Sequence, residues 1–414
     1  MPLREGFPIS NGMKKKEIKR EKVHLESITD KVGEIAMHYG FTVVRSPHVT
    51  NEDILKSKQF KGHDHYGDAD EKVALTRWYI DGRLDLEPQP VAVHFKKPFS
   101  GSSMRKKTNH EMYGFEIMGS NKSTSEALLL RCTLAVLEDF GYENLYIDIN
   151  SIGDRESINK FERELGSYIR KHAGDLPAKI RSELKKNNYL LLINNSPETK
   201  ELRQNAPQPI GSLSEIGRLH FKEVLESLET FNTAYKIKPN ILSNKLYASN
   251  TIFEIRQAKD PAGNLTDDGE LLAYGYRYNH LAKKIGGKRE IPTVGVTIFI
   301  KRHPSLNKKV SVKKIKKPRF YLVQLGSTAK LKALNIVEML RKQKIPIYHS
   351  ITKDKITGQL SGAEYMKATH VLVMGQKEAV ENTMIVRSIT NREQETVPLD
   401  KLGDFLKKLK GGKK

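Results

Sequence analysis

Apolar positions along the chain change between helical and strand-like spacing, and these changes mark its elements. Apolar residues recur near the helical period over residues 23–38, and residues 125–140 form a strongly apolar stretch that ends at Gly141. Residues 41–45 and 145–149 instead have strand character. The pattern therefore predicts a mixed fold in which long helices pack against a sheet.

The most strand-like part of the sequence lies between residues 245 and 302. Residues 245–256, 271–278 and 292–300 are rich in β-branched and aromatic side chains, and Gly286 and Gly287 separate the last two stretches. Tyr274, Tyr276 and Tyr278 would floor one face of the resulting sheet. Such a face is suited to a small planar ligand.

After residue 319 the pattern changes to alternating strands and helices. We expect strands at residues 320–325, 346–349, 370–375 and 383–388, and helices at 328–343, 360–368 and 399–409. Alternation of this kind predicts a small sheet with helices on its faces. The C-terminal part is therefore expected to be a separate α/β domain over residues 320–410.

The net charge of the chain indicates what kind of partner it binds. The chain has 71 lysine and arginine residues against 49 acidic ones, a formal net charge of +22, which favours binding of polyanions such as nucleic acid. Basic residues without an acidic neighbour crowd the segment 303–319, and the candidate RNA contacts are Lys308, Lys309, Lys313, Lys314, Lys316, Lys317 and Arg319. A solvated linker is the alternative interpretation of this run.

Other chemistry is less supported. The single cysteine, Cys132, lies in the apolar stretch 125–140, and His63 and His65 have no further ligand at metal-binding spacing, so we expect neither a disulfide nor a metal site. The first residues lack an apolar secretion segment, and no stretch is long enough to span a bilayer. A cytoplasmic protein is expected.

Several motifs, in order, resemble the histidyl-tRNA synthetases, a family of class II aminoacyl-tRNA synthetases. They are Tyr247 with the TIFE of residues 251–254, the GYRYNHL of 275–281, the IGG of 285–287 and the VGVTIFIKR of 294–302. The resemblance extends from about residue 23 onward. It implies an α+β fold: a class II antiparallel sheet flanked by helices over residues 23–302, with a helical insertion at about 153–238. A basic arm (1–22), a basic linker (303–319), an anticodon-binding-like domain (320–410) and a basic tail (411–414) complete the expected organisation.

The resemblance also implies a site and partners. The ligand pocket would be formed by Tyr247, Gly275, Arg277, Tyr278, Glu116 and Glu126. Arg302 and Arg105 would contact ATP, although counting from Pro98 or from Phe115 places Gly101 or Ser103 at the position of Arg105 unless the loop is shortened. An active member would use ATP, magnesium and histidine, would bind tRNA, and would be a homodimer.

The same comparison of motifs indicates losses at catalytic positions. Ser243 replaces an arginine that activates the histidine carboxylate, and Phe299 replaces a glycine that lies close to adenine. Ile117 and Asn121 take the places of a glutamine and a glutamate that bind histidine, and residues 73–84 lack a proline and a glutamate that grips the substrate amino group.

Three hypotheses follow. The first is a synthetase-like protein that binds tRNA or other RNA and has lost or weakened histidine activation. The second is an active but divergent histidine–tRNA ligase. The third is a histidine-sensing regulatory subunit, against which the expected anticodon-binding-like region argues.

Overall fold

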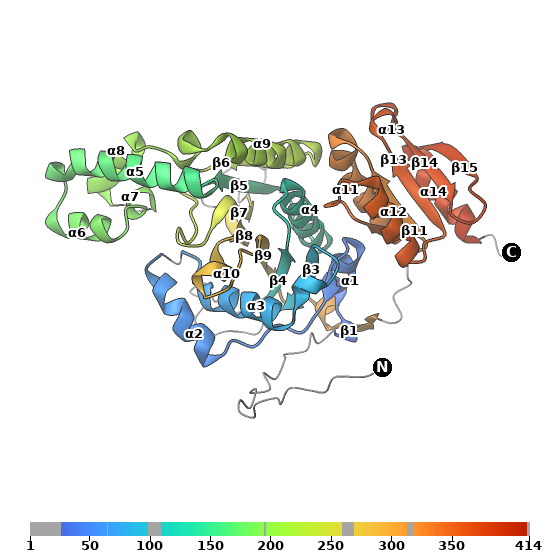
Figure 1. The fold of residues 1–414 in the computed structure, drawn as a ribbon, viewed down its shortest axis with the longest axis horizontal. Helices are drawn as coiled ribbons and strands as arrows, with labels where there is room; N and C mark the ends of the chain where they lie inside the picture. Colours follow the sequence, from blue (N-terminus) through green and yellow to red (C-terminus); the bar gives the residue numbers. More distant parts are fainter. Residues whose placement is uncertain are drawn as a thin grey trace, which may run out of the picture.

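The computed structural model describes residues 26–63, 65–97, 109–193, 196–258, 269–312 and 318–411. Within these ranges no helix is both long and apolar enough to cross a lipid bilayer. Figure 1 shows a large sheet at the centre, a group of helices projecting at one end and a second α/β lobe at the other.

The central sheet has eight strands in the order β2-β3-β4-β9-β8-β7-β5-β6. From β3 to β5 each neighbouring pair of strands is antiparallel. The edge strand β2 is parallel to β3, and the other edge strand β6 is parallel to β5. The strands, in spatial order, are Thr42–Val43, Val91–Lys96, His110–Met118, Thr293–Lys301, Glu270–Arg277, Ser249–Gln257, Leu145–Ser151 and Ala234–Ile237. The mixed fold with a large antiparallel-rich sheet is therefore confirmed.

Helices cover both faces of this sheet because its central strands present apolar side chains on both sides. On one face lie α1 (Lys31–His38), α4 (Ser123–Asp139) and α9 (Glu215–Thr230). On the other lie α3 (Ala69–Asp81) and α10 (Leu281–Lys284), with α2 (Asn51–Ser57) packed against α3. A capping box between Thr50 and Asp53 stabilises the start of α2.

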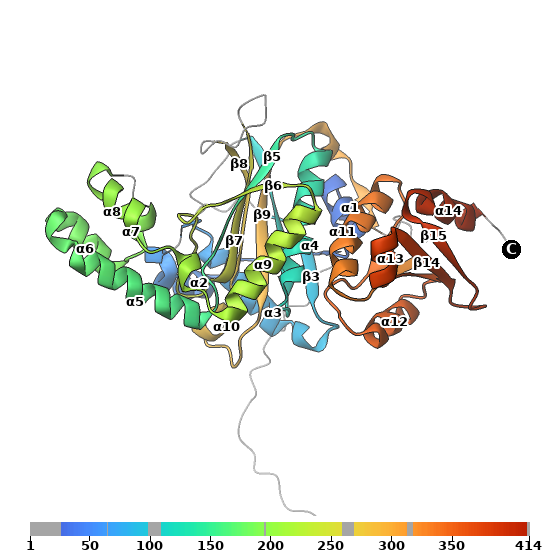
Figure 2. The ribbon, with the colours of Figure 1, turned by 90° about the horizontal axis from the view of Figure 1, so that it is seen from above.

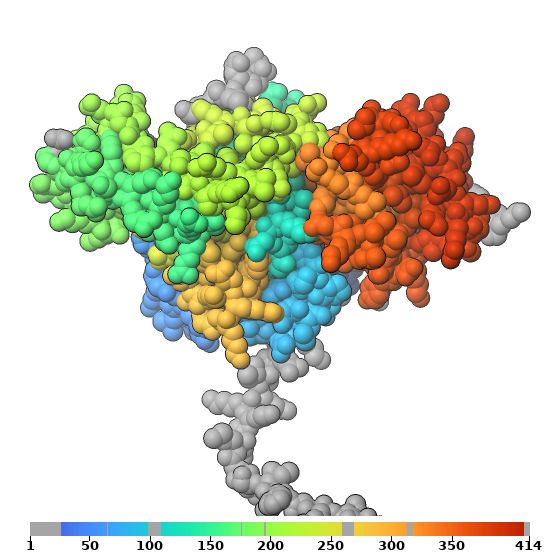
Figure 3. All heavy atoms as spheres, turned by 45° about the horizontal axis from the view of Figure 1, so that its top comes forward, coloured from blue at the N-terminus to red at the C-terminus, as the bar shows by residue number. Residues whose placement is uncertain are grey.

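The projecting helices form an arm beyond α9. Its members are α5 (Arg155–Lys171), α6 (Ala178–Lys186), α7 (Leu190–Ile193) and α8 (Lys200–Asn205). Figures 2 and 3 show this arm and the C-terminal lobe at opposite ends of the molecule.

The C-terminal lobe contains a five-stranded sheet in the order β12-β11-β13-β14-β15. Its strands, in chain order, are β11 (Phe320–Gln324), β12 (Ile347–His349), β13 (His370–Met374), β14 (Thr383–Ser388) and β15 (Gln394–Pro398). Its helices are α11 (Ser327–Lys342), α12 (Ile356–Tyr365), α13 (Gln376–Glu381) and α14 (Leu399–Gly411). The predicted small α/β lobe is confirmed, with one strand (β15) and one short helix (α13) more than predicted. A short ladder between β1 (Ile28–Thr29) and β10 (Val310–Ser311) precedes it.

A buried polar network, which we call the interlobe clamp, joins α11 to α1 and α4. Arg341 binds both carboxylate oxygens of Asp139 at 3.0 and 2.8 Å and also binds Glu338. Glu338 in turn accepts a 2.7 Å hydrogen bond from the Tyr39 hydroxyl and pairs with Arg131 at 3.3 Å. These five side chains tie the C-terminal lobe to the central sheet.

Candidate ligand site on the central sheet

Alternation along β8 separates two sets of predicted site residues. Successive side chains of a strand point to opposite faces, so Tyr274, Tyr276 and Tyr278 share one face while Gly275 and Arg277 belong to the other. We call the first the tyrosine face. Gly275 is needed where it lies, because an added Cβ would stand 2.4 Å from Cζ of Phe253.

The tyrosine face is covered by residues from the start of α3 and the turn before it. Tyr66 stacks on Tyr274 with ring centroids 4.2 Å apart and lies 5.8 Å from Tyr276. The Asp68 carboxylate accepts hydrogen bonds from the hydroxyls of Tyr276 and Tyr274 at 2.6 and 3.3 Å. Tyr247 is fully buried beside them, with its hydroxyl 3.4 Å from that of Tyr276. Tyr66 and Asp68 therefore cover the tyrosine rings that were expected to bind a planar ligand.

A buried ion pair fills the middle of this face. The Lys72 ammonium lies 2.6 Å from a carboxylate oxygen of Glu116, and the two side chains are 1 % and 0 % exposed. The rings of Tyr276 and Tyr278 lie 5.4 and 4.8 Å from the same nitrogen, within cation–π distance. The Tyr278 hydroxyl donates to the second oxygen of Glu116 at 2.8 Å.

Glu116, Tyr276 and Tyr278 thus form an ammonium cage whose occupant is Lys72. The backbone of Gly295 makes room for it, since a Cβ there would lie 1.9 Å from a carboxylate oxygen of Glu116. An aromatic and carboxylate enclosure of this kind suits a primary ammonium group. In this chain a lysine of α3 supplies that group.

The end of the tyrosine face near residue 299 is filled as well. Phe299 is fully buried and its ring centroid lies 5.9 Å from that of Tyr274. The Lys97 ammonium binds Glu71 at 2.5 Å and the Thr297 hydroxyl at 2.7 Å. Burial alone lowers the pKa of Lys97, but Glu71 and the other nearby carboxylates outweigh it and raise that pKa.

Arg277 and Glu126 were expected in the ligand pocket, but they lie on the opposite face of the sheet. The Arg277 guanidinium binds both oxygens of Glu126, with Nε 2.7 Å from one, and donates to the Ser120 carbonyl at 2.6 Å. His220 of α9 lies 2.8 Å from the same carboxylate. Burial opposes ionisation of Glu126, yet Arg277 and His220 outweigh it and lower its pKa to about 2. The pair joins β8, α4 and α9.

Ile117 and Asn121 were expected at two histidine-binding positions. Ile117 is fully buried in the core beneath α4, facing away from the tyrosines, whereas its neighbour Glu116 faces them. Asn121 accepts a 3.1 Å hydrogen bond from Asn279. Ile117 therefore lies away from the tyrosines, whereas Glu116, which was itself expected in the pocket, lies among them. Ser243 is buried at the edge of a separate cavity of about 180 Å³ beside Lys245.

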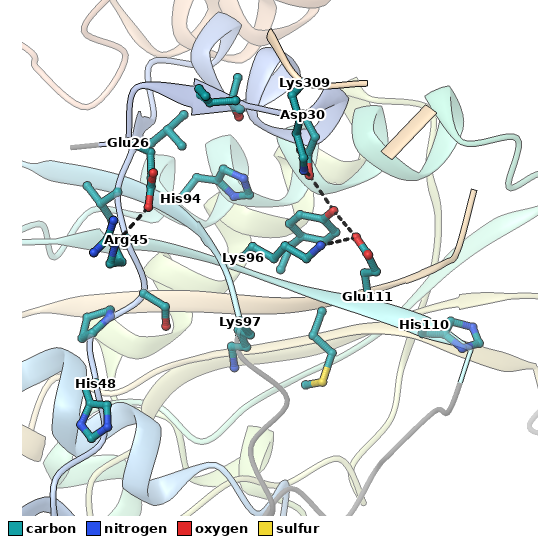
Figure 4. Close-up of a pocket in the computed structure, with 18 of the residues that line it drawn as sticks. Glu26, Asp30, Arg45, His48, His94, Lys96, Lys97, His110, Glu111 and Lys309 are labelled. Atoms are coloured by element: carbon teal, nitrogen blue, oxygen red, sulfur yellow. Dashed lines mark hydrogen bonds and ion pairs between the residues drawn. The ribbon is translucent and has the colours of Figure 1, made fainter. Parts of the chain in front are cut away.

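Arg302 does not share a pocket with Tyr278. The Tyr278 amide donates to the Thr293 carbonyl at one end of β9, and Arg302 follows the other end. At about 3.3 Å per residue, the two ends are roughly 30 Å apart. Arg302 is exposed and lines a cavity of about 930 Å³. Figure 4 shows its wall, where Lys96 pairs with Glu111 and Lys309 approaches Asp30.

The remaining predicted residues are divided between described and undescribed parts of the chain. Arg105, Lys313, Lys314, Lys316 and Lys317 lie outside the described residues. Lys308 and Lys309 are exposed next to β10, and Arg319 is exposed at the start of the C-terminal lobe. Among the described residues, no group of three or more histidine, cysteine or acidic side chains is arranged to hold a metal ion.

Sequence reasoning missed the residues that fill the site. Asp68 and Lys72 are separated by one helical turn, which places both on the same face of α3, but nothing in the sequence marks that face as buried. Charged residues at this spacing usually indicate a solvated helix face. Only the pairing with Glu116 shows otherwise.

Comparison with known proteins agrees with this architecture. Residues 304–409 match the family described as "Anticodon binding domain". The histidine–tRNA ligase of Thermosynechococcus vestitus is 27 % identical over 308 residues, covering 74 % of this chain and 69 % of the relative. That of Bacillus subtilis is 26 % identical over 376 residues, covering 87 % and 86 %.

Among solved structures, apo S. aureus histidyl-tRNA synthetase has the same fold, with a TM-score of 0.50, 22 % identity and coverage of 91 % of this chain and 94 % of that one. The anticodon-binding match and the sequence similarity over 74–87 % of the chain support its membership of the histidyl-tRNA synthetase family, and the fold agrees with it.

Proposed function

We propose that this chain is a histidyl-tRNA synthetase-like protein that binds tRNA or another RNA and in which histidine activation is lost or weakened. The observation that carries the proposal is the occupied ammonium cage. A free amino acid would have to displace Lys72 from Glu116, and this would separate two charges that are almost completely buried.

The charges on the tyrosine face support the same conclusion. Activation of a carboxylate by ATP needs cations directed at the phosphates, because fixed charges stabilise the transition state. Basic side chains on this face include Lys72, Lys97, Arg256 and, toward its edges, Lys238 and Lys301. Each is paired with a carboxylate of the chain itself, so none is directed at a nucleotide.

Space at the adenine end is a further argument. The buried ring of Phe299 stands where the resemblance expects a glycine, with its centroid 5.9 Å from that of Tyr274. A planar base needs a slot between side chains or against bare backbone. Here the slot is replaced by an aromatic packing contact.

RNA binding is supported by charge and by the C-terminal lobe. The net charge of +22 favours a polyanion, and the lobe matches a family described as an anticodon binding domain. The basic set Lys308, Lys309, Lys313, Lys314, Lys316, Lys317 and Arg319 belongs to this proposal as RNA contacts. So do a cytoplasmic location and assembly as a homodimer.

Histidine-dependent exchange of pyrophosphate into ATP tests the proposal. The Bacillus subtilis histidine–tRNA ligase, assayed beside this protein, gives the reference rate. Loss of one stabilising group lowers a rate about 100-fold to 1,000-fold, and several are replaced here, so we expect no exchange above background. Exchange within about tenfold of the reference would show that the chain is an active ligase.

Two binding measurements complete the test. Fluorescence anisotropy with labelled tRNA should give binding near 0.15 M salt, and absence of binding would remove the RNA part of the proposal. Calorimetric titration with histidine should give no heat of binding. A saturable signal would instead favour a histidine-sensing regulatory role.

A further inference from the structure

A basic cleft separates α1 from the C-terminal lobe on the side away from the tyrosine face. Its volume is about 920 Å³, and Figures 1 and 2 show α1 beside the lobe in both views. The basic residues on its walls are Lys31, Arg319, Arg341, Lys342, Lys344 and Lys407, and the acidic ones are Glu34 and Asp139.

Several of the basic side chains in the cleft are not neutralised by strong ion pairs with carboxylates of the cleft walls. Asp139 is already bound by Arg341 at 2.8 Å and lies 3.7 Å from the Lys31 ammonium. Arg319 and Lys344 are exposed and form no ion pair with another described residue. Within the described part of the chain Lys407 pairs only with the exposed Asp404, at 3.4 Å, a contact of little energetic weight. The cleft therefore carries a net positive charge toward solvent.

The interlobe clamp fixes the walls of the basic cleft relative to each other. Arg341 of the clamp also forms part of the cleft wall, so the spacing between α1 and the lobe is set before any ligand arrives. Preorganised cations lose little freedom on binding. Low-dielectric walls also concentrate the field of such charges on an entering anion.

The chemistry of the lining selects the part of a nucleic acid that would enter. The described lining residues include no phenylalanine, tyrosine or tryptophan and one histidine, His38, so the cleft offers little aromatic surface on which an exposed base would stack. Lysine and arginine side chains suit phosphate oxygens. We propose that the basic cleft binds the phosphodiester backbone of RNA without reading its sequence. This inference rests on the proposed function, that the chain binds RNA.

The test uses the full-length protein and a fluorescein-labelled single-stranded RNA of mixed sequence. Anisotropy titrations between 50 and 300 mM KCl give the slope of log K against log salt. The cleft variant carries Arg319→Gln, Lys344→Gln and Lys407→Gln. The control carries Lys56→Gln, Lys222→Gln and Lys377→Gln, which removes the same charge from lysines that pair weakly with helix neighbours elsewhere.

Each phosphate contact on single-stranded nucleic acid contributes about 0.7 to the salt slope. If all three side chains make one contact each, the cleft variant should have a slope shallower by about 2 and roughly 100-fold weaker binding at 0.1 M salt. The control should stay within about threefold of the unmodified protein.

Three results would overturn the inference. Equal losses in both variants would mean that RNA responds to net charge alone. An unchanged cleft variant would show that RNA binds elsewhere. A changed oligomeric state in light scattering, with RNA affinity retained, would make the cleft a subunit contact. Absence of RNA binding by the unmodified protein would instead refute the proposed function itself.

Discussion

Replacing Lys72 with methionine is expected to destabilise the central sheet strongly. The substitution keeps most of the side-chain volume but leaves the Glu116 carboxylate buried without its counter-ion. Removing one partner of a buried pair typically costs about 3 to 5 kcal/mol. The Tyr278 hydroxyl still donates to Glu116, so we expect a value near the lower end, about 3 kcal/mol.

The second half of the cycle isolates the charge. Glu116→Gln alone strands the Lys72 ammonium, whereas Lys72→Met with Glu116→Gln removes both charges and keeps an acceptor for Tyr278. The double variant should therefore be about 2 kcal/mol more stable than the sum of the single effects predicts.

The fluorescence of Trp78 allows the unfolding of α3 itself to be followed. Trp78 is the only tryptophan of the chain, it is buried, and it lies on α3 six residues after Lys72. Urea unfolding followed by Trp78 fluorescence therefore reports the helix that carries the lysine. A Lys72→Met variant within about 1 kcal/mol of the unmodified protein would refute the argument that the pair is desolvated and energetically coupled.

The ammonium cage gives an independent outcome. Lys72→Ala should leave a space bordered by Glu116 and two tyrosine rings, into which ethylammonium fits. Ligand binding to the folded state raises the unfolding midpoint in proportion to ln(1 + [L]/Kd). Ethylammonium should stabilise the Lys72→Ala variant but not the unmodified protein, and equal behaviour of the two would contradict an occupied cage.

Two further predictions concern the opposite face and the interlobe clamp. The Glu126 pKa is lowered from 4.5 to about 2, so its contribution to stability is present above pH 4.5 and is lost as the pH falls toward 2. In acid unfolding followed by circular dichroism, the free energy of unfolding of Glu126→Gln should fall less between pH 4.5 and pH 2 than that of the unmodified protein, by about 3 kcal/mol in total. Identical pH profiles would show that the Glu126–Arg277 pair does not cause the acid sensitivity. Arg341→Leu leaves the Asp139 carboxylate partly buried and without Arg341, so small-angle scattering should show a larger radius of gyration as the C-terminal lobe detaches, and an unchanged radius would show that apolar contacts suffice.

The sequence was most informative where periodicity and burial coincide. The apolar stretch 125–140 forms α4, and the tyrosines at alternate positions of residues 274–278 do share one face, because a strand leaves no other arrangement. The same rule would have separated Arg277 from the tyrosines. Assigning both to one pocket followed the resemblance and neglected the alternation.

The filling of the site was not predictable from a single chain. Lys72 and Glu116 are 44 residues apart, and each has an ordinary sequence context. A buried charge is recognised only by its partner, and the partner is known only when β4 and α3 are placed together. By contrast, the positive charge of residues 303–319 was evident at once, but it did not indicate that α1 and α11 would border a cleft.

The interlobe clamp also sets a length. Arg341 joined to Asp139 and Glu338 joined to Tyr39 fix the C-terminal lobe to the central sheet, and the arm of α5 to α8 lies at the opposite end of the molecule, as Figure 3 shows. The fold therefore sets the distance between these two ends. An RNA that touches both ends must already have a matching span, and shorter fragments would reach only one of them.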